Sequence, residues 1–303
     1  MNRYQQTSQH IPLTGALLLV LLCLVWGGNL VSIKVSNQSV PPLLTAAIRS
    51  CVASFLLWIY AKVVREQVFL PTELVKHGVA IGLLFGAEFL LLYWGLNFTH
   101  ASRAVLFLYT HPLWTALMAH FILTDDRLNL NKILGICLAF LGLTLVFGSR
   151  AEALGPVAWV GDLMELVAGF LWAATTIYIK RFIWNTPITH FQTLFAQLFF
   201  SIPLLILGSL GLEWGRQVSL DPLAVAAIFY QCVIVAFVSY LAWFRMIHLY
   251  PVSRLAAFTF LAPFFGVILS GLLLHEAITL FLWIGLGLVA AGIYLVNRPR
   301  ASG

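Results

Sequence analysis

The residue that most clearly could take part in chemistry is Glu88, an acid in the middle of the apolar stretch GAEFLLLYW. Burying a carboxylate in such a stretch costs at least several kcal/mol unless the group is neutral, paired or in contact with water. Glu88 therefore binds an amine of a solute or carries a proton, or else it is a structural acid that is protonated or paired with an arginine. We favour a functional role, which is the usual one for an acid inside a membrane span.

Arg49 is the natural partner for such an acid. It lies roughly two turns inside another apolar stretch, where it could pair with Glu88 or with a carboxylate of a solute. The alternative is that its long side chain reaches back to the membrane interface, which this depth also allows. If Glu88 and Arg49 form a permanent pair, Glu88 cannot carry protons, and His111 is the second candidate for that role.

Aromatic side chains recur at helical spacing in two further stretches. One face carries Arg103, Phe107, His111 and Trp114, and a matching face carries Arg254, Phe258, Ala262 and Phe265. Two aromatic walls would suit apolar or cationic organic solutes, although an aromatic stripe in a membrane helix more often serves packing. The imidazole of His111 and the carbonyl freed by the following proline could face a cavity, or the histidine could join two helices through a hydrogen bond.

Polar residues at helical spacing mark further faces that are turned away from lipid. They are Asn29 and Ser32 below Trp26, Thr175 and Tyr178 below Trp172, and His190, Thr193, Gln197 and Ser201 in a later stretch, with Gln231 in another. Such faces meet either water or another helix, because Ser and Thr also pack between membrane helices. Asp162 and Glu165 lie within two turns of a helix start, where they reach the outer surface or favour the helix N-terminus.

Membrane-spanning helices have to position these residues. Apolar runs long enough to cross a bilayer recur along the whole chain. They cover residues 13–34, 43–63, 75–98, 103–123, 132–148, 157–180, 188–210, 223–249, 252–274 and 280–296. We predict an all-α integral membrane protein with ten transmembrane helices.

Composition argues against several other classes of protein. Hydrophobic residues make up 61% of the chain and charged residues 9%, which leaves no stretch for a soluble domain. The net charge of +6 comes from scattered Lys and Arg and not from a basic patch that would bind nucleic acid. The four cysteines are isolated, and no HExxH, GxSxG or carboxylate cluster indicates a metal site or an enzyme. We expect no cofactor.

The chain also repeats itself. WGGNLVSIK at residues 26–34 returns in outline as WAATTIYIK at residues 172–180, and Ser-Arg followed by Pro112 returns as Ser-Arg followed by Pro263. We predict two five-helix repeats, residues 13–150 and 156–298, which together form one membrane domain. Because each repeat holds an odd number of spans, the second is inverted in the membrane, as in many secondary transporters.

In the last span of each repeat, glycines leave one face of the helix without side chains. Gly135 and Gly142 lie at heptad spacing in the fifth span, and Gly285 and Gly292 in the tenth. Neither span has a charge near its middle. We therefore expect these two helices to brace the bundle from outside.

Basic residues predict the orientation of the protein in the membrane. With a cytoplasmic N-terminus, the inner side holds Arg3, Lys62, Arg65, Lys76, Arg127, Lys132, Lys180, Arg181, Arg245, Arg254, Arg298 and Arg300, and the outer side holds Lys34, Arg103, Arg150 and Arg216. This excess on one side follows the positive-inside rule. It predicts a multi-pass protein of the cytoplasmic (inner) membrane with both termini in the cytoplasm.

Several motifs occur in a fixed order: WGGN in the first span, HASRA and YPVSRLA near the starts of the fourth and ninth spans, and an acid after each of these two spans (Asp126 and Glu276). The ordered set resembles the EamA-type ten-helix exporters of the drug/metabolite transporter superfamily, over essentially the whole chain. Asp126 departs from the glutamate usual in that family, and Ala173-Ala174 replaces a glycine pair in the second repeat. The resemblance implies a central cavity between spans one to four and six to nine, alternating access, and export of small metabolites, amino acids among them.

We therefore expect a secondary transporter that exports amino acids or related small metabolites. Glu88 and Arg49 would engage charged groups of the solute, and aromatic faces would cover its apolar part. The nearest alternative is an efflux pump for cationic or aromatic drugs. A membrane enzyme and a protein that transports nothing are further alternatives. The solute, a coupling proton, the direction of flux and the choice between monomer and homodimer stay open.

Overall fold

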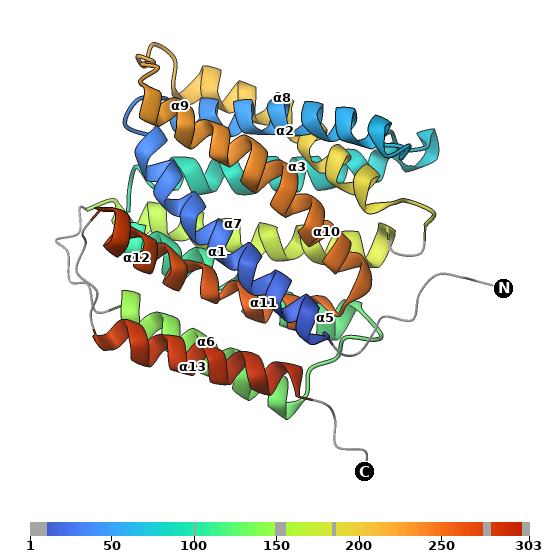
Figure 1. The fold of residues 1–303 in the computed structure, drawn as a ribbon, viewed down its shortest axis with the longest axis vertical. Coiled ribbons are helices and arrows are strands. Elements are labelled where there is room, and N and C mark those ends of the chain that lie inside the picture. The colour runs from blue at the N-terminus through green and yellow to red at the C-terminus, as the bar shows by residue number, and fades with distance from the viewer. Residues whose placement is uncertain (1–10, 100, 149–155, 184–185, 275–279, 299–303) are drawn as a thin grey trace.

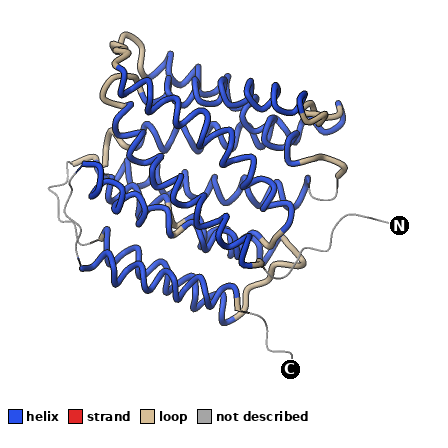
Figure 2. Tube along the Cα trace, viewed as in Figure 1, coloured by secondary structure: helices blue, strands red, loops and turns tan. Residues whose placement is uncertain are grey.

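The computed structural model describes residues 11–99, 101–148, 156–183, 186–274 and 280–298. Of the residues used above, Arg3, His100, Arg150, Glu276 and Arg300 lie outside the described residues. The described residues form helices and loops, without strands, as Figure 2 shows. The prediction of an all-α protein is confirmed.

The described residues contain ten helices that are long and apolar enough to cross a membrane, which confirms the predicted number of spans. The first five spans are α1 (Leu13–Ser36), α2 (Pro42–Val63), α3 (Val75–Gly95), α4 with α5 (Ala101–Leu108 and His111–Ile122) and α6 (Leu130–Phe147), and the short 3-10 helix η1 (Thr72–Leu74) precedes α3. The sixth to eighth spans are α7 with the π-helix η2 (Ala158–Tyr178 and Ile179–Ile183), α8 (His190–Leu212), and α9 with the π-helix η3 and α10 (Pro222–Phe229, Tyr230–Ser239 and Tyr240–Leu249). The last two spans are α11 with α12 (Val252–Thr259 and Leu261–Leu274) and α13 (Leu280–Asn297).

Successive spans run in opposite directions, so the bundle has two ends. The start of α1 and the end of α13 lie at the same edge in Figure 1, as an even number of spans requires. We call this edge the Leu13 end. The opposite edge, where α1 and α3 finish and α7 begins, is called the Ser36 end (Figure 1).

The helix starts follow from local chemistry. Pro42 lies in the first turn of α2, where the missing amide hydrogen costs least. Asp221 caps α9 by accepting a hydrogen bond from the backbone N–H of Ala224 at 2.9 Å. The hydroxyl of Ser39 donates to the same carboxylate. These hydrogen bonds, that from Ser39 first, hold the pKa of Asp221 below its usual value.

The fourth and ninth spans are interrupted, which differs from the continuous helices that we predicted. A proline removes the hydrogen bond to the carbonyl four residues earlier. For Pro112 that carbonyl belongs to Leu108, the last residue of α4, and for Pro263 it belongs to Thr259, the last residue of α11. Each break therefore lies where the proline leaves a helical carbonyl without its partner.

The eighth span changes its helical pitch near its middle. After two turns of α9, residues Tyr230–Ser239 form the π-helix η3 before α10 resumes an ordinary pitch. A π-helix bonds each N–H five residues back, so it rotates the following residues relative to a straight α-helix. The predicted continuous helix over 223–249 did not include this rotation.

The fifth and tenth spans form a pair at one edge of the bundle, as α6 and α13 in Figure 1 show. A Cβ on Gly135 would lie 2.5 Å from the carbonyl oxygen of Gly292, and one on Gly142 would lie 2.6 Å from that of Gly285. The helices are thus antiparallel and in backbone contact. The contact is also reciprocal, because positions that correspond in the two repeats exchange places. This is the contact expected of a two-fold relation between these helices.

Replacing Gly142 by Val will loosen this pair. Overpacking of a well-packed contact costs about 1–3 kcal/mol, and the nearest atom that the added side chain would meet is a backbone oxygen of α13, which cannot rotate away. Gly287, on the same α13, has no atom within 4 Å of the position of its Cβ and supplies the control variant Gly287→Val. Thermal unfolding in detergent should show a lower midpoint for Gly142→Val than for the control. Equal midpoints would contradict the close contact.

Candidate functional site

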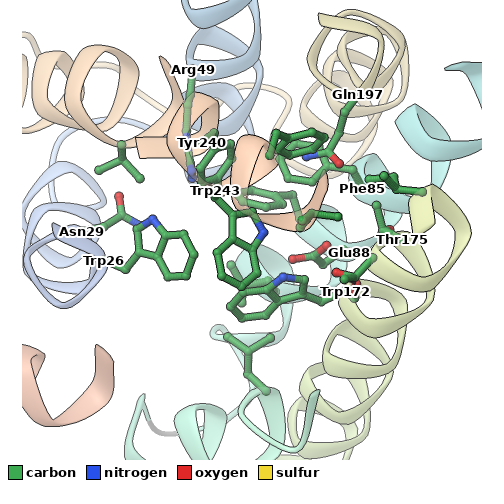
Figure 3. A pocket seen from close by; sticks show the side chains of 18 of the residues that line it. Trp26, Asn29, Arg49, Phe85, Glu88, Trp172, Thr175, Gln197, Tyr240 and Trp243 are labelled. Atoms are coloured by element: carbon green, nitrogen blue, oxygen red, sulfur yellow. Dashed lines mark hydrogen bonds between the residues drawn. The ribbon is translucent and has the colours of Figure 1, made fainter. Parts of the chain in front are cut away.

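A cavity lies in the centre of the bundle, between helices of both predicted repeats (Figure 3). Its volume is about 100 Å³. One water-sized group occupies roughly 10–15 Å³ on this scale, so the cavity has room for a small organic solute. It is lined by Trp26, Asn29, Ile33, Arg49, Phe85, Glu88, Phe89, Leu92, Leu108, Tyr109, Trp172, Thr175, Thr176, Ile179, Gln197, Val235, Tyr240, Trp243, Phe244 and Ile247.

Glu88 extends from α3 into this cavity (Figure 3). Its side chain is buried, with 6% of the residue exposed. Among the described residues its carboxyl group accepts no hydrogen bond and forms no ion pair. The cavity therefore contains an acid whose hydrogen-bonding capacity is not used by any group that the structure describes.

Arg49 enters the cavity from α2 and does not extend to the membrane interface, since only 2% of the residue is exposed. Its guanidinium group donates a hydrogen bond to the hydroxyl of Tyr240. The guanidinium carbon lies 4.8 Å from the ring centre of Phe89 and 5.0 Å from that of Tyr240. Nε and Nη1 are buried without a hydrogen-bond partner among the described residues. Aromatic faces and the hydroxyl of Tyr240 thus hold the cation, the hydroxyl of Tyr93 also interacts with it, and it makes no ion pair with Glu88.

Aromatic rings form a continuous wall around the two charged groups. The ring of Trp26 meets that of Trp172 with centroids 6.2 Å apart, that of Trp243 at 5.1 Å and that of Tyr240 at 6.4 Å, all edge to face. The indole N–H of Trp26 donates to the hydroxyl of Ser239 at 2.9 Å, which fixes the ring. Trp26 and Trp172 occupy corresponding positions in the two sequence repeats, and the structure brings them into contact.

Few of the side chains that line the cavity are polar. Asn29 and Gln197 contribute amides, and Oδ1 of Asn29 is buried without a hydrogen-bond partner among the described residues. The hydroxyls of Thr175 and Thr176 donate to carbonyls one turn earlier in α7, at 2.9 Å and 3.0 Å, so their oxygens remain able to accept. The cavity combines one acid, one base, two amides and a few hydroxyls with a mainly aromatic surface.

Six of the eleven predicted site residues line the cavity: Glu88, Arg49, Asn29, Trp26, Trp172 and Gln197. The other five, His111, Trp114, Phe107, Gln231 and Phe258, do not line it. The prediction of two aromatic walls on the fourth and ninth spans treated each span as one continuous helix. The breaks before His111 and after Thr259 change the direction of the residues that follow, His111 and Trp114 among them, whereas Phe107 and Phe258 precede the breaks.

The residues outside the cavity have structural contacts. The ring of His111 stacks on Trp172 at 3.7 Å, and its Nε2 lies 2.7 Å from the hydroxyl of Thr259, so it supports the cavity wall from behind. The ring of Trp114 packs edge-on against Phe170. The guanidinium group of Arg103 lies 5.7 Å from the ring centre of Phe107.

Two further residues belong to the buried interior. The amide nitrogen of Gln231 donates to Ser36 at 3.0 Å, and its oxygen lies 3.5 Å from the hydroxyl of Tyr93. Phe258 is buried, and its carbonyl accepts from the thiol of Cys23 at 3.2 Å. Gln231 therefore joins α1 to the π-helix η3.

The residues that we did not predict could have been found from their spacing. Tyr240, Trp243, Phe244 and Ile247 all line the cavity and follow the order i, i+3, i+4, i+7, which marks one helix face. The same order surrounds Glu88 on α3 in Phe85, Phe89 and Leu92. Aromatic enrichment on these two faces was the available signal.

The comparisons with known proteins agree with this architecture. The sequence profile of the EamA-like transporter family matches residues 13–148 and again residues 159–298. The chain belongs to the EamA-like transporter family. It is therefore a multi-pass membrane transporter that handles small molecules, and the resemblance stated from its motifs is confirmed.

Relatives of this EamA-like transporter cover nearly its whole length. A probable amino-acid metabolite efflux pump of Escherichia coli K12 is 28% identical over 285 residues, which is 92% of this chain and 93% of that protein. An uncharacterized transporter of Bacillus subtilis 168 is 23% identical over 289 residues, or 91% and 94%. A solved crystal structure has a TM-score of 0.76 at 20% identity, covering 93% of this chain and 96% of that one, and shares its fold.

Polar clusters close the EamA-like bundle at its Leu13 end. Asp126, 1% exposed, accepts from the ammonium group of Lys132 at 2.5 Å and from the backbone N–H and hydroxyl of Ser253. The acid after the fourth span therefore holds the start of the ninth. The ammonium group of Lys180 donates to the carbonyl of Ile247 at 2.9 Å, which joins η2 to α10.

A second cluster lies at the Ser36 end. The carboxylate of Asp162 on α7 accepts from the guanidinium group of Arg103 on α4 and from the hydroxyl of Thr99 at 2.6 Å. From the sequence we predicted that Asp162 and Glu165 either reach the outer surface or favour a helix N-terminus. The surface alternative is wrong for both, since Asp162 is 7% exposed and Glu165 is 0% exposed. The end of α3 packs over the start of α7 and covers them.

Proposed function

We propose that this EamA-like transporter exports amino acids or closely related small metabolites by alternating access. The observation that carries the proposal is the central cavity in which an unpaired acid, Glu88, lies among aromatic rings close to a second charged group, Arg49. A zwitterion with a short side chain suits such a cavity in charge and in size. The name of the Escherichia coli relative supports the same class of solute.

Each charged group has unused capacity for one end of a zwitterion. Glu88 can accept hydrogen bonds from an ammonium group, since no protein group occupies its oxygens among the described residues. Two nitrogens of Arg49, Nε and Nη1, are buried and donate to no group among the described residues, and a solute carboxylate would accept from them. The rings of Trp26, Trp172 and Trp243 would cover the apolar part.

Alternating access would proceed by rocking of two inverted repeats, residues 13–150 and 156–298, about the cavity. The contact between Trp26 and Trp172 and the reciprocal glycine contact of α6 with α13 support this arrangement. With the positive-inside rule, the Leu13 end faces the cytoplasm of a cell whose inner membrane holds the protein. Rocking would then open the Leu13 end and the Ser36 end in turn.

A second candidate function is efflux of cationic or aromatic drugs. The unpaired carboxyl of Glu88 inside an aromatic wall favours it, since organic cations bind to carboxylates and ring faces. Arg49 argues against it, because a second cation in the same cavity would repel the drug. Protons could drive either process, and Glu88 qualifies for that role because no permanent pair with Arg49 blocks it.

Counterflow into proteoliposomes tests the proposed function. Vesicles loaded with an unlabelled amino acid should accumulate the same labelled amino acid, and a panel of small amino acids and cationic dyes should rank the amino acids first. Vesicles without protein are the control. Accumulation of dyes alone would support the drug pump, and accumulation of neither class would contradict both functions.

A further inference from the structure

A second buried acid, Glu165, lies on α7 outside the central cavity. The residue is 0% exposed, and both of its carboxyl oxygens are buried without a hydrogen-bond partner among the described residues. It lies on the same helix as Trp172 and Thr175, which line the cavity two to three turns further along. The described transport site does not use this acid.

The surroundings of Glu165 are close-packed. A Cβ on Gly95, the last residue of α3, would lie 3.2 Å from Oε1 of Glu165. One turn earlier on α7, a Cβ on Gly161 would lie 2.8 Å from the carbonyl oxygen of Gly95 and 2.8 Å from the backbone nitrogen of Thr99. The backbones of α3 and α7 therefore touch at the Ser36 end, and this contact keeps water away from the acid.

Among the described residues, few charged groups are near enough to stabilise a carboxylate at this position. Asp162, on the same helix, is negative and already binds Arg103 of α4. Glu88 of α3 faces the cavity, and His111 of α5 stacks on Trp172. Lys180 and Arg181 lie in η2, at the opposite end of the bundle. The carbonyl end of α3 also disfavours a negative charge beside it.

These contacts determine the protonation state that the closed Ser36 end permits. An ionised carboxyl group with neither water nor a partner is much less stable than a neutral one in the same place. A neutral carboxylic acid fits between α3 and α7, whereas a carboxylate there needs water. In the part of the chain that the structure describes, the end of α3 covers Glu165, so separation of this end from the start of α7 would admit water to the acid.

We propose that Glu165 is a proton-binding site, which holds a proton while the Ser36 end of the bundle is closed and releases it to solvent when this end opens. The proton passes from the carboxyl oxygen to water, and the carboxylate takes one back before closure. The opening step belongs to the alternating access of the proposed function. Because α7 also lines the cavity, the proton at Glu165 would be linked to solute binding without touching the solute.

Hydrogen exchange of the purified full-length protein in detergent tests the proposal without any solute. Peptides covering residues 95–99 and 158–165 should lose protection as the pH rises, relative to peptides from α6, which correct for the chemical pH dependence of exchange. Glu165→Gln carries a neutral amide and should stay protected throughout. Glu73→Gln removes an exposed glutamate of η1 at the opposite end and leaves Glu165 and its surroundings intact, so this variant should keep the pH dependence. The same pH response in wild type and Glu165→Gln, or no response in wild type, would overturn the proposal.

Infrared spectroscopy gives a second measurement that does not require Glu165→Gln to fold. Among the described residues, the other buried acids outside the cavity, Asp126, Asp162 and Glu213, all accept hydrogen bonds. A protein with Glu88→Gln should therefore retain the carbonyl band of a protonated carboxylic acid at neutral pH, contributed by Glu165. Absence of this band would overturn the proton site, whatever the outcome of the counterflow experiment.

Discussion

Replacing Glu88 by Gln abolishes the transport of amine-bearing solutes and leaves the fold intact. The amide has the size of the carboxyl group but no charge to offer an ammonium group. Removing one partner of a buried ion pair costs about 3–5 kcal/mol, so solute binding should weaken roughly 100-fold or more. The protein itself loses no ion pair or hydrogen bond, because Glu88 makes none among the described residues.

The measurement compares counterflow rates and dissociation constants of wild type and Glu88→Gln at equal protein content. Thermal unfolding of the two proteins establishes that both are folded. Glu73→Gln is a matched control, since Glu73 is an exposed glutamate in η1, ahead of the same α3. Unchanged transport by Glu88→Gln would remove the acid from the mechanism and with it the main support for an amine-bearing solute.

Replacing Arg49 by Gln changes the preference of the transporter from zwitterions to cations. A solute carboxylate loses a charge-assisted interaction of about 1.5–3 kcal/mol, so binding of amino acids should fall roughly 10- to 100-fold. An amine without a carboxylate loses nothing and gains from the removal of a nearby positive charge. Arg49→Lys keeps the charge but lacks the planar group that stacks on Phe89 and Tyr240, so it should restore amino-acid binding only in part.

Competition among three solutes tests whether Arg49 contacts the carboxylate of the solute. An amino acid, its methyl ester and the corresponding amine differ only at the carboxylate end. Wild type should favour the amino acid, and Arg49→Gln should favour the ester and the amine. If all three compete equally in wild type, Arg49 does not contact the solute, and its place between two rings is structural. A preference of wild type for the amine would support the drug pump.

The membrane spans and the main charged groups of the cavity could be predicted from sequence, because both depend on local composition. Residue types alone decide whether about twenty residues are apolar enough to span a bilayer. An acid and a base within such runs stand out for the same reason, and Glu88 and Arg49 both line the cavity. Pro112 and Pro263 were part of the repeated motifs, but we predicted continuous spans and not the breaks before these prolines.

Other features depend on how distant segments meet. The π-helix η3 directs Tyr240 into the cavity beside Val235, five residues earlier, and a straight helix does not predict that pairing. His111 supports Trp172 from behind because two separate helices, α5 and α7, bring the rings within 3.7 Å. The sequence spacing of these two residues contains no information about that contact.

By itself, the sequence determined that this chain is a ten-span helical membrane protein of the EamA-like transporter family, because hydropathy and ordered motifs are properties of single segments. Only the tertiary structure decided which polar groups are paired. Arg103 and Asp162 lie 59 residues apart in sequence and meet at the Ser36 end, whereas Glu88 and Arg49 share a cavity without pairing. The burial of Glu165 was decided there too, since the free energy of a charged group depends on the atoms that surround it in space and not on its neighbours along the chain.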